Sequence, residues 1–124
     1  MTEKAVIPSN IKLHQNSRIL ELEYGADEKY QLSCEYLRIN SPSAEVRGHG
    51  PGQEVLQLGK ENVNIKTIEP VGHYAVCLMF DDGHSTGIYS WDWLYHLCKN
   101  YDSIWQEYLA KLEKAGHQRK VTSN

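Results

Sequence analysis

Alternating apolar and polar residues dominate the first part of the chain. Apolar side chains take about every second position in "IPSNIKLHQ" and again in "RILELEY", and Asn16-Ser17 lies between the two segments. This spacing predicts an N-terminal β-hairpin. We expect a turn at "GADEKY" and then a short helix in "LSCEYLRI", with Ser33 as its N-cap residue.

Two later segments, "VNIKTIEPVG" and "YAVCLMF", give the strongest strand signals. In the second segment both alternating sets of side chains are apolar, which predicts a central strand covered on both faces. Pro70 cannot donate a backbone hydrogen bond, so we expect it to mark the end of the first strand. "STGIYS" is a further predicted strand.

After Ser90 the apolar spacing changes from every second residue to every third or fourth. The apolar residues at this spacing, which predict a helix, are Trp91, Leu94, Tyr95 and Cys98. We expect a second helix from Ser103, because Ser103 and Gln106 have the spacing of a capping box. Gly116 is the expected end of that helix.

These elements predict an α+β fold. A mostly antiparallel β-sheet is expected, with a short helix after the N-terminal hairpin and two helices at the C-terminal end. At 124 residues the chain has the length of about one domain. We expect a single domain over residues 1–116 and a disordered tail over residues 117–124.

The composition narrows the class of protein. The chain has 40% hydrophobic and 23% charged residues and a net charge of −3, so no basic surplus favours nucleic acid or an anionic membrane. No apolar run approaches the roughly 20 residues of a membrane-spanning helix, and the N-terminus lacks the apolar core of a secretory signal. The sequence therefore predicts a cytoplasmic protein. Its three widely spaced cysteines are expected to be buried free thiols.

The segment "FDDGHS" holds the first group of candidate site residues. Asp82-Gly83 predicts a two-residue type I′ turn, because Asp-Gly suits the positive φ that both central positions of this turn need. In such a hairpin Asp81 faces His84 across the ladder. The contact explains this cluster without any ligand.

A loop rich in Ser, Pro and Gly, "SPSAEVRGHGPG", is the second candidate region. It carries Glu45, Arg47 and His49, and a loop of this length is more often functional than a plain connection. An arginine such as Arg47 can hold a carboxylate or a phosphate through two parallel hydrogen bonds.

Two blocks of the sequence, "LRINSPSAEVRGHG" and "IEPVGHYAVCLMFDDGHSTGIYSWDWLYHL", carry a family resemblance. In content and order they resemble the gamma-butyrobetaine hydroxylase-like N-terminal domain family, over about residues 11–101. The resemblance implies a small stand-alone bacterial member of a group whose function is largely unassigned.

The resemblance also implies a zinc site, in which three cysteines after a helix end join a histidine from a "DGH" turn. Here "YLRIN" matches the helix end and His84 matches the histidine, whereas Ser41, Ser43 and Val46 take the cysteine positions. Tetrahedral zinc sites use four Cys, His or carboxylate ligands, so we expect no zinc at this position. The alternative is iron or another divalent metal held by nitrogen and oxygen ligands. Its candidate ligands are His84, His49, Asp81, Asp82 and Glu45.

The chain lacks the sequence patterns of two enzyme classes, iron-dependent oxygenases and phosphate-binding enzymes. No histidine is followed two positions later by an acidic residue, as the iron triad of an oxygenase requires. "LGKEN" lacks the spacing of a phosphate-binding loop. We therefore expect no catalytic activity, and a small enzyme of another kind stays an open alternative.

The favoured interpretation is a non-catalytic binding or interaction module, which the resemblance links to iron–sulfur or metal homeostasis. We expect a protein partner, no nucleic acid, no membrane and no cofactor. The predicted binding surface consists of Arg47, His49, Asp82, His84 and Tyr89. The alternative function is a metal-binding protein that holds iron or zinc with His84 and nearby ligands.

Overall fold

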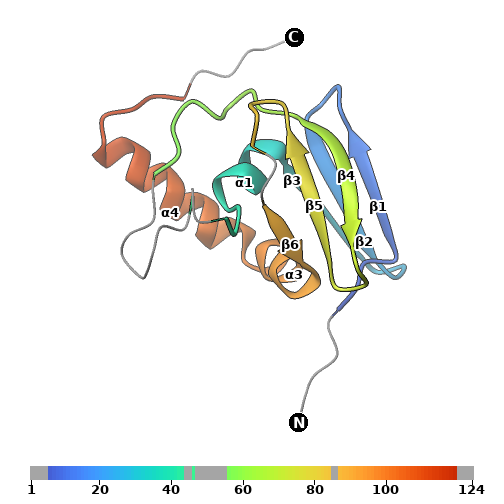
Figure 1. Ribbon diagram of the computed structural model, residues 1–124. Coiled ribbons are helices and arrows are strands. Elements are labelled where there is room, and N and C mark those ends of the chain that lie inside the picture. Colours follow the sequence, from blue (N-terminus) through green and yellow to red (C-terminus); the bar gives the residue numbers. More distant parts are fainter. Residues whose placement is uncertain (1–5, 44–45, 47–55, 85–86, 120–124) are drawn as a thin grey trace.

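Figure 1 shows the computed structural model of the chain, which describes residues 6–43, 46, 56–84 and 87–119. Within these residues the chain forms two three-stranded antiparallel sheets and three helices, so the predicted α+β fold class is confirmed. The elements are β1 (Asn10–His14), β2 (Ile19–Tyr24), β3 (Glu28–Ser33), α1 (Cys34–Ile39), β4 (Ile65–Val71), β5 (Ala75–Phe80), β6 (Ile88–Ser90), α3 (Trp91–Lys99) and α4 (Tyr101–Lys114).

The first sheet has the order β1-β2-β3, and the predicted N-terminal hairpin supplies its first two strands. In β2 the side chains of Leu20, Leu22 and Tyr24 are buried and alternate with half-exposed glutamates. β3 begins within the segment that the sequence predicted as a turn. It is a strand because Leu32 pairs with Leu20 and Tyr30 pairs with Leu22 across the ladder. The turn itself is limited to residues 25–27.

The second sheet has the order β4-β5-β6, and β5 is its central strand as predicted. Val76, Leu78 and Phe80 point into the core, whereas Cys77 on the opposite face is half-buried. The expectation that both faces are covered is therefore correct for one face only. Pro70 does not end β4 but lies within it, opposite Val76. β4 is an edge strand of this sheet, where a missing N–H donor is tolerated.

Serine hydroxyls cap the first two helices, as the sequence indicated for α1. Ser33 Oγ accepts a hydrogen bond from the backbone N–H of Tyr36 at 3.0 Å. Ser90 Oγ accepts one from the backbone N–H of Trp93 at 3.1 Å. These bonds satisfy donors that the first turn of a helix leaves without a partner.

α4 begins at Tyr101, two residues before the expected start. A single residue, Asn100, separates it from α3, and the Ser103 hydroxyl donates a hydrogen bond to the Asn100 carbonyl oxygen. The predicted capping box at Ser103 is therefore wrong. Gly116 follows the helix with a φ of 74°, which confirms the predicted stop.

Two buried tyrosines hold α1 between the second sheet and α3. Tyr36 of α1 donates its hydroxyl to the carbonyl oxygen of Leu97 at 2.7 Å. Tyr89 of β6 donates its hydroxyl to the carbonyl oxygen of Leu37 at 2.6 Å. Both tyrosines have 0% exposure, and a buried hydroxyl needs such an acceptor. The core thus fixes α1 from two sides, and all six of its residues are buried.

The three cysteines are free thiols, in line with the expectation from their spacing. Cys34 and Cys98 are buried, and Cys77 is half-buried. Burial raises the pKa of Cys34 to about 11 and the pKa of Cys98 to about 12. Both thiols therefore stay protonated at neutral pH and act as small apolar side chains.

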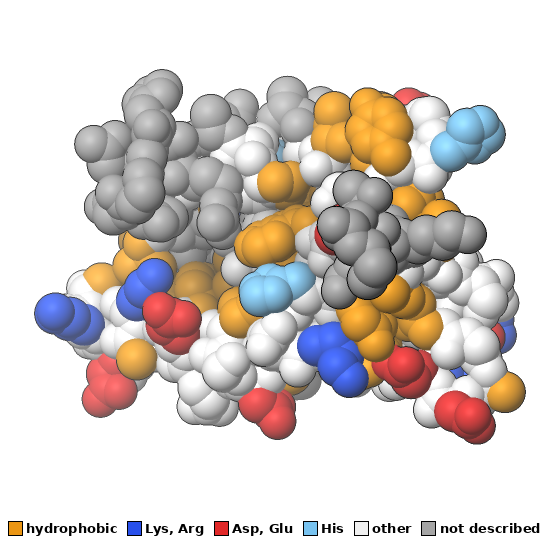
Figure 2. All heavy atoms as spheres, turned by 90° about the horizontal axis from the view of Figure 1, so that it is seen from below, with side chains coloured by type: hydrophobic (Ala, Val, Ile, Leu, Met, Phe, Trp, Pro, Cys, Tyr) orange, Lys and Arg blue, Asp and Glu red, His pale blue; other side chains and the backbone are white. Residues whose placement is uncertain are grey.

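The outer surface is mixed in character. Seen from below in Figure 2, hydrophobic side chains gather near the centre of the face and acidic and basic side chains lie along its lower edge. No helix in the described part of the chain is long and apolar enough to cross a membrane.

Of the segment expected to be a disordered tail, residues 117–119 are described and Arg119 contacts Glu35 of α1. The prediction for residues 120–124 lies outside the described residues.

Candidate functional site

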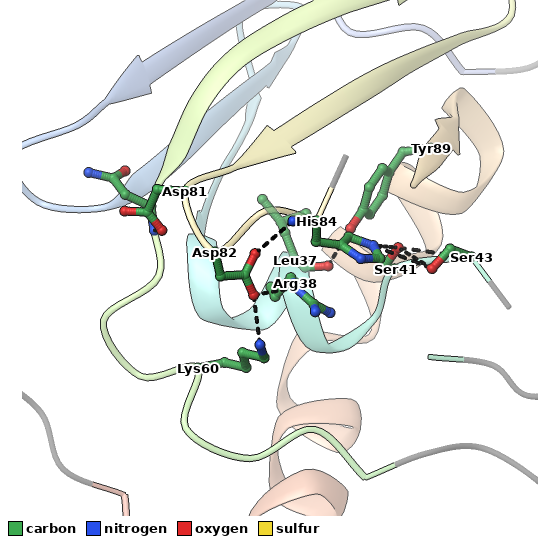
Figure 3. A network of polar contacts seen from close by, with 10 residues as sticks. Leu37, Arg38, Ser41, Ser43, Lys60, Asp81, Asp82, His84 and Tyr89 are labelled. Carbon is green, nitrogen blue, oxygen red and sulfur yellow. Dashed lines mark hydrogen bonds and ion pairs between the residues drawn. The ribbon is translucent and has the colours of Figure 1, made fainter. Parts of the chain in front are cut away.

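The first candidate site lies where the β5–β6 hairpin meets the C-terminal end of α1 (Figure 3). The backbone N–H of Phe80 donates to the carbonyl oxygen of His84 at 2.9 Å, so three residues form the turn between them. Gly83 has a φ of 90°, but Asp82 does not have a positive φ. The predicted two-residue type I′ turn is therefore wrong. A glycine with positive φ at the third position is typical of a three-residue hairpin loop.

The two aspartates of this turn point to different parts of the molecule. Asp81 Oδ1 accepts a hydrogen bond from the backbone N–H of Asn64 at 3.0 Å, so it holds the segment before β4. Asp82 instead faces α1 (Figure 3). The expected pairing of Asp81 with His84 is thus replaced by a pairing with Asn64, because the longer turn changes the register.

Asp82 is the centre of a group of charges. Its Oδ2 atom accepts hydrogen bonds from Arg38 Nε at 2.9 Å and from Lys60 Nζ at 2.7 Å. Its Oδ1 atom accepts the backbone N–H of His84 at 3.2 Å. Burial alone would raise the pKa of Asp82, but these bonds and the charge of Arg38 outweigh it and lower the pKa to about 2. The carboxylate is therefore ionised at any physiological pH.

His84 points into the interior beside the end of α1. Its Nε2 atom lies 2.9 Å from Ser41 Oγ and 3.3 Å from Ser43 Oγ, and the imidazole is only 4% exposed. Gly87 closes the group, because a Cβ atom at this position would lie 2.4 Å from Ser41 Oγ. Hairpin and helix end are thus packed directly against each other.

Of the remaining predicted surface residues, the structure describes Tyr89. Tyr89 is fully buried, so its place in the predicted binding surface is wrong, since strand alternation turns its side chain into the core. Burial also raises the pKa of its hydroxyl. Arg47 and His49, together with Glu45, lie outside the described residues.

Sequence reasoning gave Arg38 and Lys60 no role at this site, although they hold Asp82. Arg38 and Asp82 are 44 positions apart, and no local pattern encodes such a contact. One signal was available. Arg38 is a charged residue in a helix whose other side chains are mostly apolar, and a buried charge needs a partner of opposite sign.

Comparison with known proteins places the chain in a family. Residues 11–95 match the model of the family described as "Gamma-butyrobetaine hydroxylase-like, N-terminal". The chain belongs to this family. A comparison with curated proteins finds no significant match.

Two solved structures illustrate what this gamma-butyrobetaine hydroxylase-like domain is similar to. An NMR solution structure of a protein is 48% identical, with a TM-score of 0.82, and the match covers 98% of this chain and 95% of that chain. A crystal structure of a protein of unknown function from Acidithiobacillus ferrooxidans, which belongs to the DUF971 family, is 34% identical. Its TM-score is 0.63, and the match covers 77% of this chain and 97% of that chain.

The zinc site that the family resemblance implies does not fit the donor atoms of this domain. Ser41, Ser43 and His84 do converge, and the two serine oxygens lie 3.4 Å apart. Two of these donors are neutral hydroxyls, and Val46 offers no donor atom. Within the described residues, no group of three or more His, Cys, Asp or Glu side chains could hold a metal ion. The arrangement serves as a hydrogen-bonded contact between hairpin and helix.

We expect the protein, when purified without chelator, to contain far less than one zinc or iron per chain by elemental analysis. Changing Ser41, Ser43 and Val46 to Cys together would supply the three thiolates of the zinc site that the family resemblance implies, and this variant is expected to bind about one zinc. The same variant with His84→Ala is the matched control and should bind zinc more weakly. Stoichiometric metal in the unchanged protein would contradict this assignment.

Asp82→Asn is expected to lower the free energy of unfolding by about 1–2 kcal/mol at pH 7, allowing for solvent screening. Because the folded-state pKa of about 2 lies below the ordinary value of 3.8, this stability is present above pH 4 and is lost as the pH falls toward 2. Urea unfolding at several pH values measures the difference between the two proteins. The exposed Asp27→Asn is the control, and a difference that does not shrink toward pH 2 would refute the account.

Proposed function

We propose that this chain is a non-catalytic binding domain that recognises an acidic group of a protein partner. The proposed contact surface is the basic rim, which we define as Arg38, Lys60 and Asp82. The observation that supports it is the charge of this rim, where two cations share one carboxylate. The rim therefore has a local positive excess on a chain whose net charge is −3.

The exposure of the two cations decides which of them a partner can reach. The Nε atom of Arg38 is bonded to Asp82, its Nη1 atom is buried, and its side chain is only 7% exposed. The Lys60 side chain is 21% exposed. Its ammonium group is therefore the cation of the rim that would meet a carboxylate or phosphate of the partner.

The pair formed by Ser41 and His84 supports a non-catalytic role. Their 2.9 Å separation is that of a serine nucleophile and its general base. A nucleophile must also be reached by substrate, and Ser41 is 0% exposed and His84 only 4% exposed. Gly87 packs against the hydroxyl from the other side. We therefore assign this pair to packing.

The wider context remains a prediction from the sequence. A link to iron–sulfur or metal homeostasis is proposed on the family resemblance alone. The cytoplasmic location and the lack of contact with nucleic acid or membrane are proposed on composition alone.

Lys60→Glu is expected to weaken capture of the partner, because it reverses one charge of the basic rim. Lys66→Glu on the exposed side of β4 makes the same change in net charge away from the rim and is the matched control. The measurement is affinity capture from a native cell extract with quantitative mass spectrometry, after thermal unfolding has shown that both variants are folded. The proposal predicts that proteins captured by the unchanged chain and by Lys66→Glu are lost with Lys60→Glu. Equal capture by all three would refute it.

A further inference from the structure

A second group of buried charges lies where the segment that follows α4 turns back toward α1 (Figure 1). A small core of Ile39, Tyr108 and Leu112 joins the two helices here. Beside it, a cleft of about 540 Å³ opens against the residues that follow α4, including His117 and Arg119. None of these residues takes part in the basic rim.

The guanidinium of Arg119 contacts two side chains, those of Glu35 and Trp105. Its Nε atom donates to Glu35 Oε2 at 2.8 Å, and its Nη2 atom donates to Glu35 Oε1. Its guanidinium carbon lies 5.1 Å from the centre of the Trp105 ring. The guanidinium is thus held by a two-pronged ion pair on one side and an aromatic face on the other.

The acids of this site are buried more deeply than the arginine that neutralises them. The side chains of Glu35 and Glu61 are 4% and 7% exposed, whereas that of Arg119 is 27% exposed. The hydrogen bonds to Glu35 raise the pKa of Arg119, and the charge of Glu61 adds to the effect. Glu61 Oε1 also lies 3.8 Å from Nε2 of His117. The site therefore holds two buried acidic side chains near one guanidinium.

The shape of the site favours a guanidinium over an ammonium ion. Glu35 belongs to α1, which is fixed in the core. Its carboxylate therefore cannot rotate into solvent, where water would replace its partner. A carboxylate with both oxygens free matches the planar fork of arginine, and lysine would satisfy it only as a point charge. Leaving one buried charge unpaired is strongly destabilising.

The segment that carries Arg119 has no regular secondary structure. Residues 117–119 follow Gly116 and lie in neither a helix nor a strand. The pocket is formed by α1, α4 and the segment before β4, whereas its occupant comes from an irregular segment. Such an occupant can leave while the pocket keeps its shape.

We propose that Glu35, Glu61 and Trp105 form a guanidinium-binding pocket that Arg119 fills in the free protein, and that an arginine of a partner's extended segment takes when Arg119 is displaced. Because the pocket holds the guanidinium of Arg119 in the free protein, the expected ligand is the guanidinium of another arginine. Arg119 competes as a tethered ligand, whose effective concentration is in the millimolar range for short flexible linkers. Removing it should therefore increase the affinity for an external arginine.

The test uses a blocked peptide with the sequence GHQR, the sequence of residues 116–119, and the same peptide with citrulline in place of arginine. Citrulline keeps the shape of arginine and removes its charge. Binding is followed by the NMR shift of the Trp105 indole N–H in the full chain. Arg119→Ala is expected to bind the arginine peptide at least about tenfold more tightly than the unchanged protein. It should not respond to the citrulline peptide.

Two further variants keep the test decisive. Arg119→Lys retains a charge and guards against unfolding of Arg119→Ala, and it should bind the arginine peptide with intermediate affinity. Adding Glu35→Gln to either variant should abolish binding, while Gln118→Ala should behave like the unchanged protein. The proposal is overturned if neither Arg119 variant binds more tightly than the unchanged protein, if the citrulline peptide binds equally well, or if Glu35→Gln has no effect.

Discussion

The ion pair between Arg38 and Asp82 is the contact on which the candidate site depends. A guanidinium in the buried helix α1 is tolerable only with an anion beside it, and the turn between β5 and β6 supplies that anion. Asp82 also accepts the backbone N–H of His84 and so positions the next residues of the hairpin. His84 then contacts Ser41 in the interior. The need of the buried Arg38 for an anion that is distant in the sequence therefore sets the position of the hairpin tip.

The short helix α1 carries two opposite charges that do not pair with each other. Glu35 and Arg38 are three positions apart, a spacing at which helical side chains can interact. Each instead pairs with a distant segment, Glu35 with Arg119 and Arg38 with Asp82. One buried helix thus holds both the hairpin and the segment after α4, and both proposed binding sites are built on it. A substitution that displaces α1 would therefore alter both sites.

Much of the fold is encoded locally and could be predicted. Ser33 and the Trp91–Lys99 helix follow from capping and from apolar spacing. β3 was missed because its strand state comes from pairing with β2, while its own residues resemble a turn. The site was harder to predict. The hairpin was placed correctly, but its turn length depends on how Asp82 is held, and the pair of Glu35 with Arg119 spans 84 positions without any local pattern.

A double-mutant cycle of Arg38→Gln and Asp82→Asn tests the central claim most directly. The free energy of unfolding is measured by urea titration for the unchanged protein, both single variants and the double variant. If the pair organises the site, Asp82→Asn leaves Arg38 without its anion, and Arg38→Gln leaves Asp82 with Lys60 as its remaining charged partner. The double variant then recovers about 1–3 kcal/mol relative to the sum of the single losses. Losses that add within about 0.5 kcal/mol would show that the two residues act independently and would contradict the account.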